Sequence, residues 1–167
     1  MTENHASLAH FYEGWDVYQQ QITGAIAPLT PEQLALRAAP HLRSIGEIAT
    51  HMIAVRARWF HSLMGEGGAD ISPIEAWDRK DTPAHSAAEL VHGFEVTWLV
   101  IQEALARWVP ADLEYVFSGT RGGEPYAFSR QWVIWHAQHQ HRLLFAGGRF
   151  LQHVKADPVV FQHALVQ

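Results

Sequence analysis

Four segments of this 167-residue sequence place apolar residues three or four positions apart, and this spacing limits the possible folds more than any other feature. On a helix the spacing gives one apolar stripe, which must be buried against other elements. The segments span residues 7–29, 45–63, 83–108 and 129–146. Joined by short or medium connections, they predict an all-α four-helix bundle that forms a single domain over residues 1–167.

Capping signals predict where these helices begin. Ser44 and Glu47 have the spacing of a capping box, in which each side chain bonds to the other residue's backbone amide. Thr82-Pro83 combines an N-cap residue with proline at the first helical position. Ser129 is the predicted N-cap of the last long helix. The stripe of the second helix ends on Trp59 and Leu63.

The connections carry weaker signals. Residues 69–81 show no period and predict a loop across one end of the bundle. Residues 113–128 predict a short hairpin inserted before the last long helix, and this hairpin must lie against the bundle to be stable. The first helix is expected to continue through the two glycines that it contains, Gly14 and Gly24.

Composition excludes several classes of protein. The absence of cysteine removes disulfides and thiolate ligands, so imidazole, carboxylate or amide groups must hold any metal. A net charge of −5 with scattered basic residues disfavours nucleic-acid binding. There is no apolar run of membrane-spanning length and no secretory signal, so we expect a cytoplasmic protein without a membrane partner. Nucleotide-binding and serine-hydrolase motifs are also missing.

The last long helix carries inward-facing histidines. At about 100° per residue, Trp132, His136, His139 and Gln140 fall within roughly 60° of one direction, which must face the core. Two imidazoles at positions i and i+3 of a buried stripe have two interpretations. They are hydrogen-bonded core residues, or they form half of a metal site.

Two stretches resemble a known family. The sequence IGEIATH at 45–51 and the sequence SRQWVIWH at 129–136 are similar to those of the DinB superfamily. The resemblance implies an up-up-down-down four-helix bundle, frequently a homodimer. It also implies a divalent metal, commonly nickel or zinc, held by one histidine of the second helix and two of the fourth. Characterised relatives are thiol-dependent transferases and isomerases that use low-molecular-weight thiols.

Carried over to this sequence, the second-helix ligand is His51. The fourth helix lacks the family's two histidines spaced by four. Alignment on RQWVIWH places the two positions on Gln140 and Leu144, whereas alignment on the His-Arg pair at 141–142 places them on Ala137 and His141.

The resulting hypothesis is a displaced metal site made of His51, His136 and His139, with Gln140 or water completing it. Three ligands with open positions are the minimum for a metal that activates water or a thiol.

Three further side chains join Gln140 as candidates for lining a substrate pocket. Tryptophans such as Trp132 can border an apolar pocket, while Arg121 and Tyr126 flank the start of the fourth helix. Arginine suits bidentate contact with a carboxylate, but ordinary salt bridging to Glu114 or Glu124 is the favoured interpretation of Arg121.

Two functions remain open. The first is a divalent-metal-dependent enzyme of the DinB type that acts on a small molecule with a low-molecular-weight thiol. The second is a metal-free bundle with a degenerate site that serves as a small-molecule binding or dimerisation module.

Overall fold

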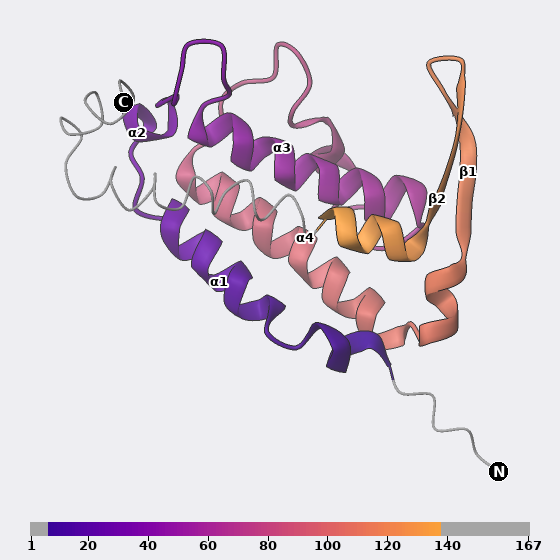
Figure 1. The fold of residues 1–167 in the computed structure, drawn as a ribbon. Helices are drawn as coiled ribbons and strands as arrows, with labels where there is room; N and C mark the ends of the chain where they lie inside the picture. Colours follow the sequence, from indigo (N-terminus) through magenta and orange to yellow (C-terminus); the bar gives the residue numbers. More distant parts are fainter. Residues whose placement is uncertain (1–6, 138–167) are drawn as a thin grey trace.

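The computed structural model of the protein describes residues 7–137, apart from the side chains of Phe11 and Arg121. The chain there is mostly helical, with one small two-stranded sheet (Figure 1). The elements in chain order are η1 (Leu8–Tyr12), α1 (Trp15–Ile26), α2 (Pro31–Leu34), α3 (Ile45–Ala57), η2 (Arg58–Leu63), η3 (Ser72–Ala76), α4 (Ala87–Arg107), η4 (Pro110–Glu114), β1 (Val116–Arg121) and β2 (Glu124–Ser129). A last helix occupies residues 130–137. The predicted helical class and the hairpin before the last helix are confirmed.

The first predicted helix is interrupted. Gly14 has φ of 96°, in the left-handed region, and separates the 3-10 turn η1 from α1. Glycine adopts this conformation without a Cβ clash, so it ends one helical segment and allows the next to start in a new direction. The prediction that the helix continues through Gly14 is wrong, whereas Gly24 lies inside α1 as expected.

Helix α3 begins where the sequence predicted. Ser44 Oγ accepts a hydrogen bond from the Glu47 backbone amide at 3.2 Å, and the Glu47 carboxylate accepts one from the Ser44 amide at 2.8 Å. Arg37 donates to both oxygens of the same carboxylate at 2.6 Å. Residues 52–57 are all buried, so this part of α3 lies at the centre of the molecule.

The end of this helix departs from α-helical geometry. Residues Arg58–Leu63 form a π-helical turn, in which the Met64 amide donates to the Trp59 carbonyl at 3.2 Å. The wider turn rotates the following side chains relative to an α-helix. As a result Phe60 and Met64 are buried, while Trp59 and Leu63, which ended the predicted stripe, are half-buried.

Helix α4 starts later than predicted. Its N-cap is Ser86, which forms a capping box with Glu89, and the helix begins at Ala87. The hydroxyl of Thr82, the predicted N-cap, instead donates to the Ala76 carbonyl at 3.3 Å. The Thr82-Pro83 pair therefore belongs to the preceding connection.

The helix directions follow from contacts between their ends. The Leu8 amide donates to the Trp108 carbonyl at 2.8 Å, and Gln19 Nε2 donates to the Phe94 carbonyl at 2.9 Å, so α1 and α4 run antiparallel. Helices α3 and α4 run in the same direction (Figure 1). Helix α1 therefore runs opposite to α3, which differs from the expected up-up-down-down order. The long connection of residues 64–86 returns along the bundle, so that α4 starts at the same end as α3.

The hairpin leads directly into the last helix. Strands β1 and β2 pair antiparallel through a turn at Gly122 and Gly123, both with positive φ. Ser129 Oγ then accepts from the Trp132 amide at 3.1 Å, which confirms Ser129 as the predicted cap. The last helix runs back along α3 from this point (Figure 1).

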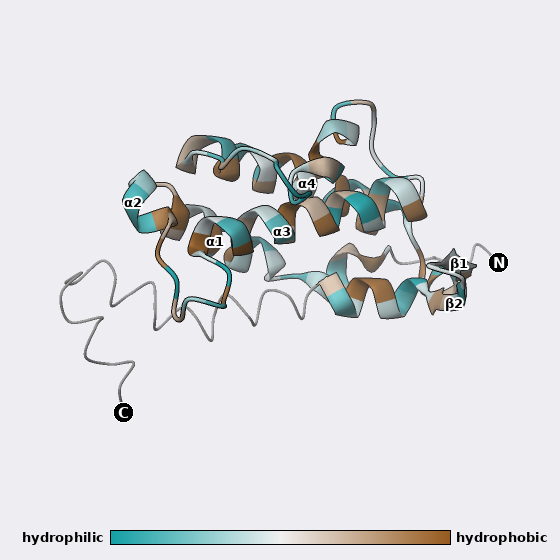
Figure 2. Ribbon diagram, turned by 90° about the horizontal axis from the view of Figure 1, so that it is seen from above, coloured by the Kyte–Doolittle hydropathy of each residue, from teal (hydrophilic) through white to brown (hydrophobic). Residues whose placement is uncertain are grey.

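Hydrophobic and hydrophilic residues alternate along the helices, as expected for elements with one buried face (Figure 2). The buried cluster joins α1, α3, α4 and residues 133–137 of the last helix. None of the helices between residues 7 and 137 combines the length and the hydrophobicity that a bilayer span requires.

Candidate functional site

The side chain of His51 lies on the face of α3 that the loop after η3 covers. It follows Ala49 and Thr50 and precedes the fully buried run of α3, and 31% of its side chain is exposed. Its ring nitrogen Nδ1 lies 2.6 Å from Oδ2 of Asp78, a residue of that loop. His51 is therefore fixed at one nitrogen and accessible at its edge.

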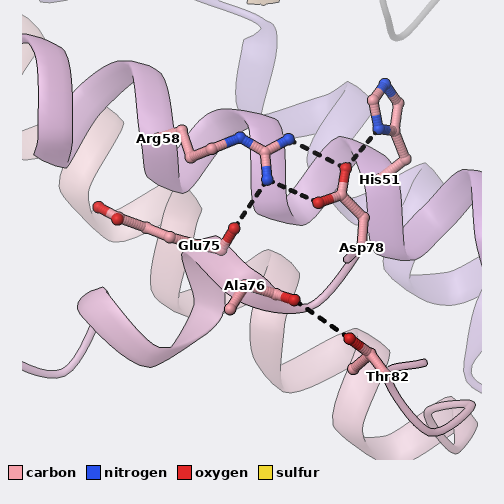
Figure 3. Close-up of polar contacts among 6 residues, drawn as sticks. All are labelled: His51, Arg58, Glu75, Ala76, Asp78 and Thr82. Atoms are coloured by element: carbon pink, nitrogen blue, oxygen red, sulfur yellow. Dashed lines mark hydrogen bonds and ion pairs between the residues drawn. The ribbon is translucent and has the colours of Figure 1, made fainter. Parts of the chain in front are cut away.

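Asp78 is held in turn by Arg58, which lies about two helical turns after His51. The guanidinium donates to Oδ1 at 2.6 Å and to Oδ2 at 2.9 Å, and also to the Glu75 carbonyl at 2.7 Å (Figure 3). Burial alone would raise the pKa of Asp78, but the hydrogen bonds from Arg58 and His51 outweigh it and lower the pKa to about 2. The carboxylate is thus ionised at neutral pH.

A second histidine is held in a similar way nearby. His61 Nδ1 lies 2.6 Å from Oε1 of Glu75, and Ser62 Oγ donates to the same oxygen at 2.7 Å. Burial would raise the pKa of Glu75, but the hydrogen bonds from Ser62 and His61 keep it below its ordinary value. Two acidic residues of the connection between η2 and α4, one in η3 and one just after it, therefore bind two histidines of the α3–η2 segment.

Sequence reasoning missed both carboxylates. Asp78 and Glu75 lie in a segment without periodicity, so no pattern linked them to α3. Arg58 and the half-buried His51 each require a hydrogen-bond partner, but this requirement alone does not say which residue provides it.

His136 lies in a row of aromatic rings. Tyr126, Phe128, Trp132 and His136 stack in succession, with centroids 5.2, 4.4 and 4.7 Å apart and interplanar angles of 17°, 16° and 11°. Trp59 meets this row edge-on, at 5.9 Å from His136. Of the four candidate pocket residues, the structure thus joins Trp132 and Tyr126 through Phe128.

His51 and His136 have different contacts in the described residues: Asp78 for His51, and Trp59 and Trp132 for His136. His136 lies against Trp59, which is eight residues or about 12 Å along the helix from His51. The described part of the last helix runs opposite to α3 (Figure 1). His139 and Gln140 lie outside the described residues, and Arg121 is described only by its backbone, which pairs with Glu124.

The group of ligands that a metal would need is not present in the described part of the chain. Within residues 7–137, no three His, Cys, Asp or Glu side chains are placed to hold an ion. One ligand position nevertheless fits. Nδ1 of His51 is bound by a carboxylate and Nε2 lies on the opposite side of the ring (Figure 3), which is the arrangement found for metal-binding histidines.

Comparisons with known proteins agree on one family. The model of the DinB family matches residues 1–141. A crystal structure of a DinB-like protein from Bacillus cereus ATCC 10987 superposes with a TM-score of 0.61 at 21% sequence identity, covering 91% of this chain and 95% of that one. No protein of curated function matches at a significant level. The structural likeness extends the similarity to the fold of most of the chain.

Proposed function

The chain belongs to the DinB family, and from this premise we propose that it is a divalent-metal-dependent enzyme that acts on a small molecule. The observation that supports the proposal best is the environment of His51. This residue occupies the position of the second-helix ligand in the family motif, and its Nδ1 is bound to Asp78 at 2.6 Å. A neutral imidazole held in this way presents Nε2 as a ligand.

The remaining ligands in this proposal come from the last helix, with His136 and His139 as the candidates. Nickel or zinc, when bound, would lower the pKa of a coordinated water or thiol. The chain's own residues would hold the ligand rings in place, and the half-buried surface around His51 would admit a small molecule.

The first experiment is a calorimetric titration of nickel, zinc or manganese into untagged protein that has been stripped with a chelator. We expect binding of one ion per chain and its loss in the variant His51→Ala. His61→Ala is the matched control, because His61 is exposed to the same extent and is also bound by a carboxylate, yet it lies outside the proposed site. It should bind the ion as the unmodified protein does.

Two results would contradict this function. If none of the three metals produces heat, or if His51→Ala binds as tightly as the unmodified protein, the metal role of His51 is wrong. A metal-free bundle that binds a small molecule would then be the better description.

A thiol co-substrate, a homodimer and a cytoplasmic location complete the proposal. The first two come from the family resemblance, and each of them can be tested separately. Turnover of electrophilic substrates with and without added low-molecular-weight thiols tests the first, and sedimentation that gives a monomer would contradict the second.

A further inference from the structure

We propose that Asp78 is a positioning residue that fixes His51 in the tautomer with the proton on Nδ1 and the lone pair on Nε2. This inference rests on the proposed function insofar as the lone pair is meant for a metal. The tautomer itself is a property of the metal-free protein and can be tested without one.

The first step is the chemistry of the contact. An ionised carboxylate offers only acceptors, and Asp78 Oδ2 lies 2.6 Å from His51 Nδ1. The nitrogen that faces it must therefore donate, and in a neutral imidazole the other nitrogen is then an acceptor. Nε2 lies on the side of the ring away from Asp78 (Figure 3).

The second step concerns what holds Asp78. Arg58 donates to both of its oxygens, at 2.6 and 2.9 Å, so the plane of the carboxylate is fixed by a two-point contact. Arg58 is itself tied to the Glu75 carbonyl at 2.7 Å. Successive hydrogen bonds from the Glu75 carbonyl through Arg58 and Asp78 thus set the position of the His51 imidazole.

The third step separates this role from simple attachment of the loop to α3. Glu75 attaches the same loop through His61 and Ser62, and so an attachment role is shared by both acidic residues. Of these two acidic residues, Asp78 is the one that contacts His51. Removing the charge of Glu75 should therefore loosen the loop without changing the His51 tautomer, and Glu75→Gln is the matched control for Asp78→Asn.

The experiment records nitrogen-15 NMR of the histidine rings in metal-free protein, with His51→Gln used to assign the signal. Spectra are recorded at rising pH until the ring signals stop changing, so that neutral rings are compared in every variant. The unmodified protein and Glu75→Gln should show His51 protonated on Nδ1. In Asp78→Asn the amide can either accept or donate, so the signal should shift toward a mixture of tautomers.

A second measurement uses nickel or zinc alone in a calorimetric titration. Loss of the carboxylate should weaken metal binding about 10- to 100-fold, the range for residues that orient a ligand, while Glu75→Gln should bind unchanged. If the unmodified protein binds no metal, the proposed function fails and the tautomer result still decides the role of Asp78.

The inference is overturned if His51 of the unmodified protein carries its proton on Nε2, which requires no variant to fold. It is also overturned if folded Asp78→Asn keeps the tautomer of the unmodified protein, or if it binds metal as tightly as Glu75→Gln does.

Discussion

The carboxylate of Asp78 links the stability of the protein to pH. Its pKa is lowered from 3.8 to about 2 in the folded chain, so folding favours the ionised form. The contribution is fully present above the unfolded pKa of 3.8 and is lost as the pH falls through about 2. A shift of this size corresponds to about 2 kcal/mol.

We therefore expect Asp78→Asn to lower the free energy of unfolding at pH 7 by about 2 kcal/mol. Its stability should also fall less steeply than that of the unmodified protein between pH 4 and pH 2. Urea denaturation at a series of pH values measures both. If the free energy of unfolding falls equally steeply in both proteins between pH 4 and pH 2, protonation of Asp78 is not the cause of the loss of stability.

Two glycines test packing against helix propensity. A Cβ on Gly93 of α4 would lie 2.6 Å from Cζ3 of Trp77 and 3.0 Å from Cγ2 of Ile53, and the Trp77 ring is stacked on His85 at 4.1 Å. A Cβ on Gly24 of α1 would meet nothing within 4 Å. Overpacking costs about 1–3 kcal/mol, whereas alanine in place of an exposed helical glycine gains about 0.5–1 kcal/mol.

Gly93→Ala should therefore lower the melting temperature, and Gly24→Ala should raise it. Both positions are helical and gain the same methyl group, so the opposite signs isolate the effect of Trp77. Equal stabilisation by the two variants would mean that Trp77 moves aside without cost.

At the same scale, the sequence identified His51 but not its environment. His51 lies at the edge of an apolar stripe and within a family motif, so local spacing marks it as a candidate ligand. Asp78 reaches it across 27 residues of chain. A contact of that kind depends on how the loop packs, and periodicity carries no information about it.

At the scale of the helices, ends were predicted where the capping chemistry is local. The box of Ser44 and Glu47 is where the sequence predicts it, whereas the predicted cap of α4, Thr82-Pro83, precedes the box of Ser86 and Glu89 that the structure shows. Both choices satisfy local rules, and the contact of Thr82 with Ala76 decides between them. The π turn at Arg58–Leu63 was not predicted, because one extra residue per turn leaves an apolar stripe that still resembles an α-helix.

Ser44→Ala tests the cap of α3. Ser44 is buried and accepts from the Glu47 amide, so its removal leaves that amide without its partner and should cost about 1 kcal/mol. Ser44→Thr keeps the hydroxyl and should retain most of the stability. Thermal unfolding of the two variants, compared with Ser86→Ala at the exposed cap of α4, provides the measurement. A loss as large in Ser44→Thr as in Ser44→Ala would assign the effect to packing.

At the scale of the whole molecule, the directions of the helices were not predictable from spacing. An amphipathic stripe specifies that a helix packs, and it does not specify which way the helix runs. The contacts of Leu8 in η1 with Trp108 and of Gln19 in α1 with Phe94 fix the direction of this part of the chain relative to α4, and the length of the connection 64–86 permits α3 and α4 to run parallel. The last helix therefore lies beside α3, with Trp132 and His136 against Trp59.

This arrangement makes a whole-molecule test of the metal proposal possible. An ion held by α3 and the last helix would join two elements that are far apart in the sequence, and a ligand that binds only the folded state raises the stability by about 4 kcal/mol at a thousandfold excess over its Kd. For a chain of this size that corresponds to a rise of roughly 10 °C in the melting temperature. The rise should disappear in His51→Ala, persist in His61→Ala and reverse when a chelator is added. An equal rise in His51→Ala would place the ion elsewhere, and no rise in the unmodified protein would mean that no ion joins α3 to the last helix.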